Sequence, residues 1–277
     1  MLARLTSAIV RGCLVALMVL TPSLLLPSVS RDASEIVLLV AFFAAALTAI
    51  EYAASYPSIV EFRDAPPFNR IRFGSLLISV LLISLVCRGE IQPSAFTGFV
   101  QAIGALIGQV IDFPFSPVRL MVLMLPEDSG PEQVALLRMA AGLAYLISLM
   151  SLGIFVAVLR FAGWPQGITG FNVWTNLPTF DPTASADVVQ RLMRDARVNI
   201  ALGFLLPFLI PVAVQAGALL FEPVNFGSYH TLIWTTVAWA FLPASLFMRG
   251  IAMRRVADMI AERRRRARQD ETAFVAA

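Results

Sequence analysis

The sequence contains no lysine, one histidine and two cysteines in 277 residues. Without lysine, the chain cannot form a Schiff base, use a lysine as a base or build a lysine-containing phosphate loop. Zinc, haem and iron–sulfur centres usually take several His or Cys ligands. The lone imidazole, His230, has no orienting carboxylate nearer in the sequence than Glu222. We therefore predict no catalytic residues, no metal site, no cofactor and no enzymatic activity.

Charged residues are also scarce. They make up 14% of the chain, whereas 58% of the residues are hydrophobic and the mean hydropathy is +0.78. Soluble domains carry about 25% charged residues, which keep their surfaces hydrated. A chain this apolar needs lipid to cover much of its surface. This composition excludes a soluble enzyme, a nucleic-acid-binding protein and a disordered regulator, and it predicts an all-α, polytopic transmembrane helical bundle.

Six apolar runs approach the roughly 20 residues that a membrane-spanning helix needs. They cover residues 12–29, 36–55, 73–87, 139–159, 200–221 and 229–248. We predict a transmembrane domain over 1–248, followed at 249–277 by a cytoplasmic basic amphipathic helix and a flexible tail. The first run has an alternative interpretation as a cleavable signal peptide, because small residues occupy 28–30. Pro22 and Pro27 interrupt the run and favour the spanning helix.

The arginines predict the orientation of the chain. Short cytoplasmic loops of membrane proteins are enriched in basic residues. If both termini are cytoplasmic, only four arginines fall in outer loops, namely Arg31, Arg88, Arg119 and Arg138. All the others then lie in the N-terminal segment, in inner loops or in the C-terminal tail. We predict a multi-pass protein of the bacterial inner (cytoplasmic) membrane with both termini in the cytoplasm.

Residues 95–125 allow two interpretations. They form two short apolar segments separated by Asp112 and a turn containing Pro114 and Pro117. Such interrupted pairs are typical of re-entrant hairpins that line transport pathways. The alternative, which we favour, is an amphipathic helix on the outer interface with its Phe and Leu face in lipid. In a conduit, the candidate polar lining residues would be Gln101, Gln109, Asp112 and Gln215, the last from the middle of the fifth span.

Two predicted inner loops, at 61–73 and 160–198, carry several aromatic residues. Large aromatic side chains are costly to expose to water, so they need headgroups, another loop or a partner protein. A stiff aromatic loop can serve as a docking surface. The candidate partner-docking residues are Phe62, Phe68, Trp164, Phe171 and Trp174.

The C-terminal tail carries a run of four arginines, Arg263, Arg264, Arg265 and Arg266. Basic residues beside a membrane attract anionic phospholipid by about 1 kcal/mol each. We expect lipid contacts at the cytoplasmic face and no nucleic-acid partner. With few polar residues inside the spans, the sequence favours an accessory subunit or assembly partner of a larger membrane complex, so other membrane subunits are expected partners. The alternative is a small channel or transporter that uses 95–125.

Overall fold

The structure is a computed structural model that describes residues 2–27, 31–164, 172–180, 187–217 and 226–276. Within these ranges all regular secondary structure is helical. The helices are α1 (Leu2–Leu25), α2 (Arg31–Ala53), α3 (Phe68–Ile91), α4 (Ala95–Ile111), α5 (Pro117–Val122), α6 (Pro131–Phe161), α7 (Val173–Asn176), α8 (Val188–Gly217) and α9 (Tyr229–Ala276).

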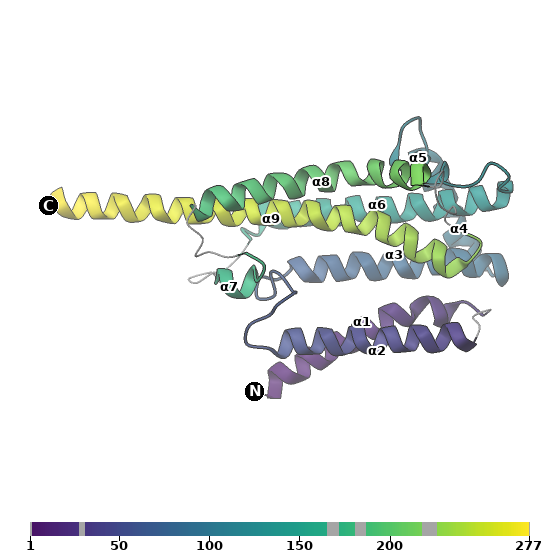
Figure 1. Cartoon of the computed structure of the whole chain (residues 1–277), viewed down its shortest axis with the longest axis horizontal. Helices are drawn as coiled ribbons and strands as arrows, with labels where there is room; N and C mark the ends of the chain where they lie inside the picture. Colours follow the sequence, from purple (N-terminus) through teal and green to yellow (C-terminus); the bar gives the residue numbers. More distant parts are fainter. Residues whose placement is uncertain (1, 28–30, 165–171, 181–186, 218–225, 277) are drawn as a thin grey trace.

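Six of these helices, α1, α2, α3, α6, α8 and α9, are long and apolar enough to cross a membrane. They lie roughly side by side, and both chain termini lie at one end of the bundle, on the left in Figure 1. We call this the terminal end, and we call the opposite end, which carries α4 and α5, the far end. The predicted all-α polytopic bundle is confirmed.

The helices extend beyond the apolar runs that predicted them. For example, α3 covers 68–91 rather than 73–87, and α9 continues without a break from Tyr229 to Ala276. Charged residues end an apolar run, but they do not end a helix, because arginine is a good helix former whose long stem reaches water. The small residues at 28–30 and the end of the fifth run at 218–221 lie outside the described residues.

Close helix crossings depend on glycine. At Gly203 of α8, a Cβ atom would lie 2.7 Å from both the backbone nitrogen of Phe247 and the carbonyl oxygen of Pro243 in α9. At Gly12 of α1, it would lie 2.7 Å from the carbonyl oxygen of Ala45 in α2. Small residues let membrane helices approach until their backbones touch. At these glycines the backbones of α8 and α9, and those of α1 and α2, are therefore in direct contact.

Candidate functional site

Two loops and two helices of the terminal end meet in a buried aromatic cluster of Phe62, Phe68, Phe155 and Trp164. Each side chain is at most 1% exposed. The ring centroids of Phe62 and Phe68 lie 4.6 Å apart, and those of Phe155 and Trp164 lie 5.5 Å apart. The indole N–H of Trp164 donates to the carbonyl oxygen of Ala65 at 3.2 Å. These rings shield each other from water.

The aromatic cluster corrects part of the predicted docking surface. Phe62, Phe68 and Trp164 face the interior of their own chain and cannot contact a partner directly. Phe171 lies outside the described residues. Trp174 lies in the short helix α7, and only its backbone is described.

A second set of contacts holds the same loops to the long helices. We call it the polar clasp, and it consists of Glu61, Thr179, Asn199 and Arg249. The Glu61 carboxylate accepts hydrogen bonds from Arg249 of α9 at 2.5 and 2.7 Å, and from the Thr179 hydroxyl at 2.8 Å. The Arg249 guanidinium also donates to Oδ1 of Asn199 in α8 at 3.0 Å. The side chain of Glu61 is 11% exposed, so solvent screens the pair only partly. One carboxylate thus ties two loops to α8 and α9.

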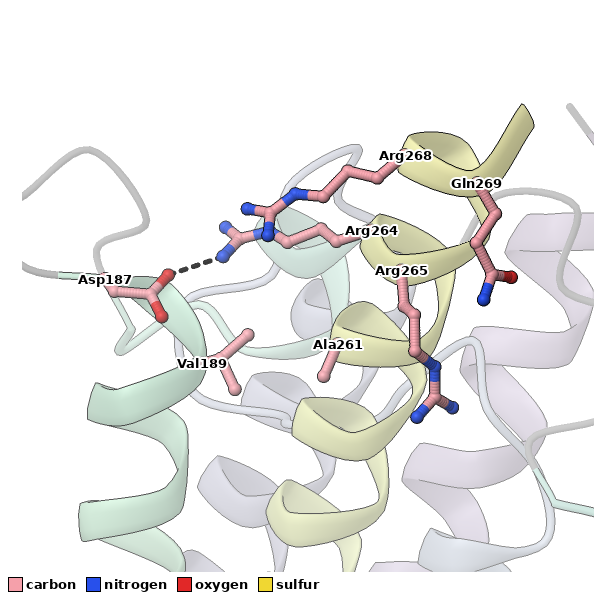
Figure 2. A pocket seen from close by; sticks show the side chains of 7 residues that line it. All are labelled: Asp187, Val189, Ala261, Arg264, Arg265, Arg268 and Gln269. Carbon is pink, nitrogen blue, oxygen red and sulfur yellow. Dashed lines mark hydrogen bonds and ion pairs between the residues drawn. The ribbon is translucent and has the colours of Figure 1, made fainter. Parts of the chain in front are cut away.

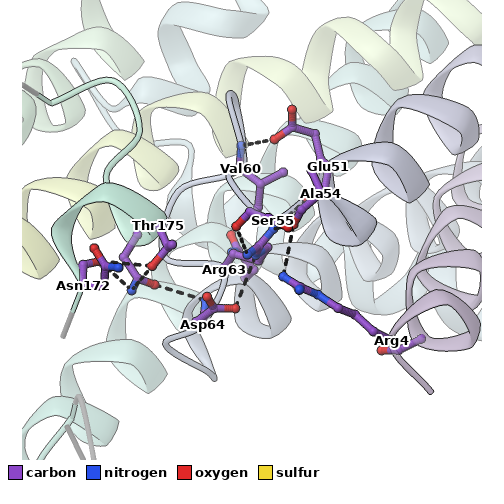
Figure 3. Close-up of polar contacts among 12 residues, drawn as sticks. Arg4, Glu51, Ala54, Ser55, Val60, Arg63, Asp64, Asn172 and Thr175 are labelled. Carbon is purple, nitrogen blue, oxygen red and sulfur yellow. Dashed lines mark hydrogen bonds and ion pairs between the residues drawn. The ribbon is translucent and has the colours of Figure 1, made fainter. Parts of the chain in front are cut away.

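The C-terminal end of α2 is closed by the loop that follows it. The Glu51 carboxylate accepts backbone N–H bonds from Ser58, Ile59 and Val60, the last two at 2.9 and 3.1 Å. Arg63 in turn donates to the carbonyl oxygens of Glu51 in α2 and of Ala54 just after it, at 3.0 and 2.7 Å, as Figure 3 shows. These bonds satisfy carbonyls that a helix end leaves without partners. Glu51 is only 5% exposed.

At the far end, Asp112 binds two arginines. Its Oδ2 accepts a 2.7 Å hydrogen bond from Nε of Arg138. Its Oδ1 lies 2.7 Å from Nε of Arg119, without the alignment of a hydrogen bond. The Asp112 side chain is 5% exposed, whereas those of Arg119 and Arg138 are 39% and 28% exposed. The carboxylate joins α5 and α6 and leaves one positive charge in excess.

The other predicted lining residues have separate positions. Gln101 donates to the carbonyl oxygen of Val86 and to the Glu90 carboxylate at 3.2 and 2.6 Å, both in α3. Gln109 is exposed on α4. Gln215 lies in the last turn of α8, not in its middle, and donates to the carbonyl oxygen of Leu123 at 3.2 Å. Gln101, Gln109, Asp112 and Gln215 thus have four different sets of neighbours.

The helix α4 has two distinct faces. Its buried positions include Gly104 and Gly108, and a Cβ on Gly108 would lie 2.8 Å from the carbonyl oxygen of Arg138 in α6. Its exposed stripe carries the large side chains Phe96, Phe99, Ile103, Leu106 and Val110. The helix crosses α3 and α6 at the far end (Figure 1). Small residues against protein and large apolar residues outside are typical of an amphipathic helix in an interface.

The predicted anionic-lipid residues lie on the part of α9 that projects beyond the bundle (Figure 1). In an open hollow, Arg264 contacts Asp187 at 2.6 Å, with Arg265 and Arg268 beside it (Figure 2). Arg264 lies about 22 Å along the helix from Arg249, at 1.5 Å per residue. The headgroup layer on one side of a bilayer is only about 5–8 Å thick. An upright α9 with Arg249 at the membrane border carries these arginines past the phosphates, and their lipid contact remains a prediction.

The described side chains at the terminal end mainly hold the chain's own parts together. Among the described residues, no group of three or more His, Cys, Asp or Glu side chains is placed to bind a metal ion. The carboxylates of Glu51 and Glu61 are both engaged in bonds within the chain. Comparisons of the chain with protein-family models, with curated proteins and with solved structures each gave no match.

Proposed function

We propose that the chain is a non-enzymatic integral protein of the bacterial inner membrane, and that it acts as an accessory subunit or assembly partner of a larger membrane complex. Both termini are placed in the cytoplasm. This orientation is supported by the excess of arginine in the terminal-end loops and tail. It is also supported by the position of both termini at one end of the bundle (Figure 1).

The observation that carries the assembly role is the exposure of α2. Only 11% of its apolar stretch is buried, compared with 44% for α3 and 50% for α9. Neighbouring residues such as Leu38, Leu39 and Val40 point to different sides of a helix, yet each is more than half exposed. The helix packs mainly against α1, which in turn contacts α3. Most of the circumference of α2 is thus free to pack against a helix of another subunit.

The C-terminal part of α9 is a second exposed surface. Nearly every residue from 261 to 269 is exposed, and the C-terminal end of α9 projects beyond the bundle (Figure 1). The loops at the terminal end are, by contrast, packed against their own chain in the aromatic cluster and the polar clasp. The exposed α2 and the exposed end of α9 are surfaces on which other membrane subunits could pack, as expected for an assembly partner. A channel is less well supported, because Gln101, Asp112 and Gln215 each bond to a different part of the chain and Gln109 is exposed.

Site-specific crosslinking tests the role of α2. A photoreactive residue would replace Leu39 or Phe42, which are 55% and 65% exposed. The controls are Met150 on α6, which is 57% exposed, and Ala41, which is 1% exposed and therefore inside the chain. In native membranes we expect Leu39 and Phe42 to form adducts with one membrane protein that copurifies in stoichiometric amount. Adducts with lipid alone, as expected at Met150, would rule out α2 as the docking helix.

A further inference from the structure

A cavity of about 290 Å³ opens between the α1–α2 hairpin, the start of α3 and the loop that joins α2 to α3. Its walls carry three arginines, Arg11, Arg63 and Arg70. It lies at the terminal end, where α2 ends and α3 begins (Figure 1). We propose that this cavity binds the phosphate of one anionic phospholipid, with an acyl chain lying along α1 and α3. This inference does not rest on the proposed assembly role.

The first argument is the balance of charge around the cavity. Arg63 is engaged by Asp64 at 3.3 Å and by the carbonyl oxygens of Glu51 and Ala54. Arg11 contacts the Ser7 hydroxyl and the face of the Tyr52 ring, 4.4 Å from its centroid, and no carboxylate of the described residues pairs with it. Arg70 is exposed, and no hydrogen bond or ion pair holds it among the described residues. Two guanidinium groups therefore line the cavity without a counter-charge.

The second argument is that the neighbouring carboxylates are already occupied. Glu51 accepts three backbone N–H bonds, and Glu61 is bound by Arg249 and Thr179. Moving either carboxylate to Arg11 or Arg70 would undo the cap of α2 or the polar clasp. Asp64, the third carboxylate of this region, pairs with Arg63. A negative charge bound by Arg11 and Arg70 would therefore come from another molecule. A phosphate group matches the forked donors of arginine.

The third argument is the order of polar and apolar residues along the walls. On α1, Arg11 is followed one turn deeper in the membrane by Leu14 and Val15. On α3, Arg70 is followed one turn deeper by Phe73. The cavity is thus basic towards the terminal end and apolar towards the membrane centre. A phospholipid has the same order, with its phosphate at the membrane surface and its acyl chains below. A free phosphate would make no favourable contact with the apolar wall.

Native mass spectrometry of the full-length protein in detergent tests the site. The probes are phosphatidylglycerol, which is anionic, phosphatidylcholine, which is zwitterionic, and inorganic phosphate as a competitor. We expect one tightly held phosphatidylglycerol, weaker phosphatidylcholine, and no displacement by inorganic phosphate. Equal binding of the two lipids, or displacement of the anionic lipid by inorganic phosphate, would overturn the proposal. The second result would assign the cavity to a soluble anion.

Variants place the lipid in this cavity. The double variant Arg11→Gln with Arg70→Gln removes both unpaired charges and leaves Arg63, which caps α2, in place. We expect its affinity for phosphatidylglycerol to fall about tenfold or more. The Lys versions of both positions keep the charge but lose the forked donors, so their affinity should lie between those of the wild type and the double Gln variant. The matched control, Arg160→Gln with Arg254→Gln, removes two exposed charges outside this cavity and should bind as the wild type does.

A further variant guards against misfolding of the double variant. Val15→Trp fills the cavity and keeps every arginine, so it should also lose the tightly held lipid. Both variants must elute as single species and keep the helical circular dichroism of the wild type. Retained lipid in a folded Val15→Trp protein, or an equal loss in the Arg160→Gln, Arg254→Gln control, would contradict the assignment to this cavity.

Discussion

The indole N–H of Trp239 in α9 donates a 3.0 Å hydrogen bond to the carbonyl oxygen of Pro207 in α8. In a regular helix, the amide of residue 211 would bind this carbonyl, but residue 211 is also a proline and has no amide hydrogen. Water is absent from the apolar part of a membrane, so the oxygen needs a protein donor. Trp239, which is 2% exposed, supplies that donor from the neighbouring helix.

This relationship predicts the effect of Trp239→Phe. The variant keeps an aromatic ring next to Tyr145, whose ring centroid lies 5.8 Å away, but it removes the donor. We expect the free energy of unfolding to fall by about 1 kcal/mol, measured by denaturant titration in detergent. The control is Trp234→Phe, since Trp234 has no hydrogen bond among the described residues. An equal loss in both variants would show that the indole matters only through its volume.

A second prediction concerns the crossing of α8 and α9. In Gly203→Ala, the new Cβ meets backbone atoms of α9 at 2.7 Å, and backbone cannot swing aside as a side chain does. We expect a loss of about 1–3 kcal/mol in the free energy of unfolding. Gly153→Ala in α6 is the matched control, because a Cβ there meets nothing within 4 Å. That control should be neutral or slightly stabilising, since alanine favours the helix.

A third prediction concerns the far end. Asp112→Asn removes the charge that keeps Arg119 and Arg138 together. We expect a loss of about 2 kcal/mol in the free energy of unfolding, because solvent screens the partly exposed arginines. Adding Arg138→Gln to this variant should recover part of the stability, since it ends the repulsion between the two arginines. No recovery in the double variant would mean that Asp112 acts through its shape and not through its charge.

A fourth prediction concerns pH. The hydrogen bond from Arg264 holds the pKa of Asp187 below its ordinary value of 3.8. Because the folded state binds this proton less readily than the unfolded state, the carboxylate stabilises the fold above the ordinary pKa. This contribution is lost as the pH falls through the lower pKa of the folded state. The wild type should therefore unfold at a higher temperature than Asp187→Asn at pH 7. The difference between the two unfolding temperatures should shrink as the pH is lowered.

The control for this pH effect is Asp258→Asn. Asp258 is exposed on α9 and has no ion pair among the described residues. This variant removes an exposed carboxylate without breaking an ion pair, so it should unfold at nearly the same temperature as the wild type at pH 7. The effect at Asp187 should also weaken with added salt, because the pair is open to solvent. A pH-independent difference between wild type and Asp187→Asn would contradict the role of the charge.

The apolar runs predicted the six membrane-spanning helices because lipid demands long stretches without charge. They could not predict the helix ends, since arginines such as Arg70 continue a helix at the membrane border. The error at Gln215 has the same origin. The predicted span 200–221 placed it in the middle, but α8 begins at Val188 and its last described residue is Gly217. The described helix begins 12 residues before the predicted span, on the side of the terminal end.

The sequence indicated that Trp164 needs cover from water, and it is buried in the structure. The residues that cover it could not be predicted. Its indole binds the carbonyl of Ala65, which lies 99 residues earlier in the chain, and its ring packs on Phe155 of α6. Composition shows that an aromatic side chain needs cover, but it does not show which part of the chain provides it. The pair of Glu61 and Arg249, separated by 188 residues, was missed for the same reason.

The unbroken course of α9 makes it a lever. Arg264 is bound to Asp187 ahead of α8, and about 12 further residues extend α9 by about 18 Å beyond it. A change of about 10° in the direction of this end moves its tip sideways by about 3 Å. A small rearrangement where α9 meets the start of α8 thus becomes a displacement of several ångströms at the tip of the tail.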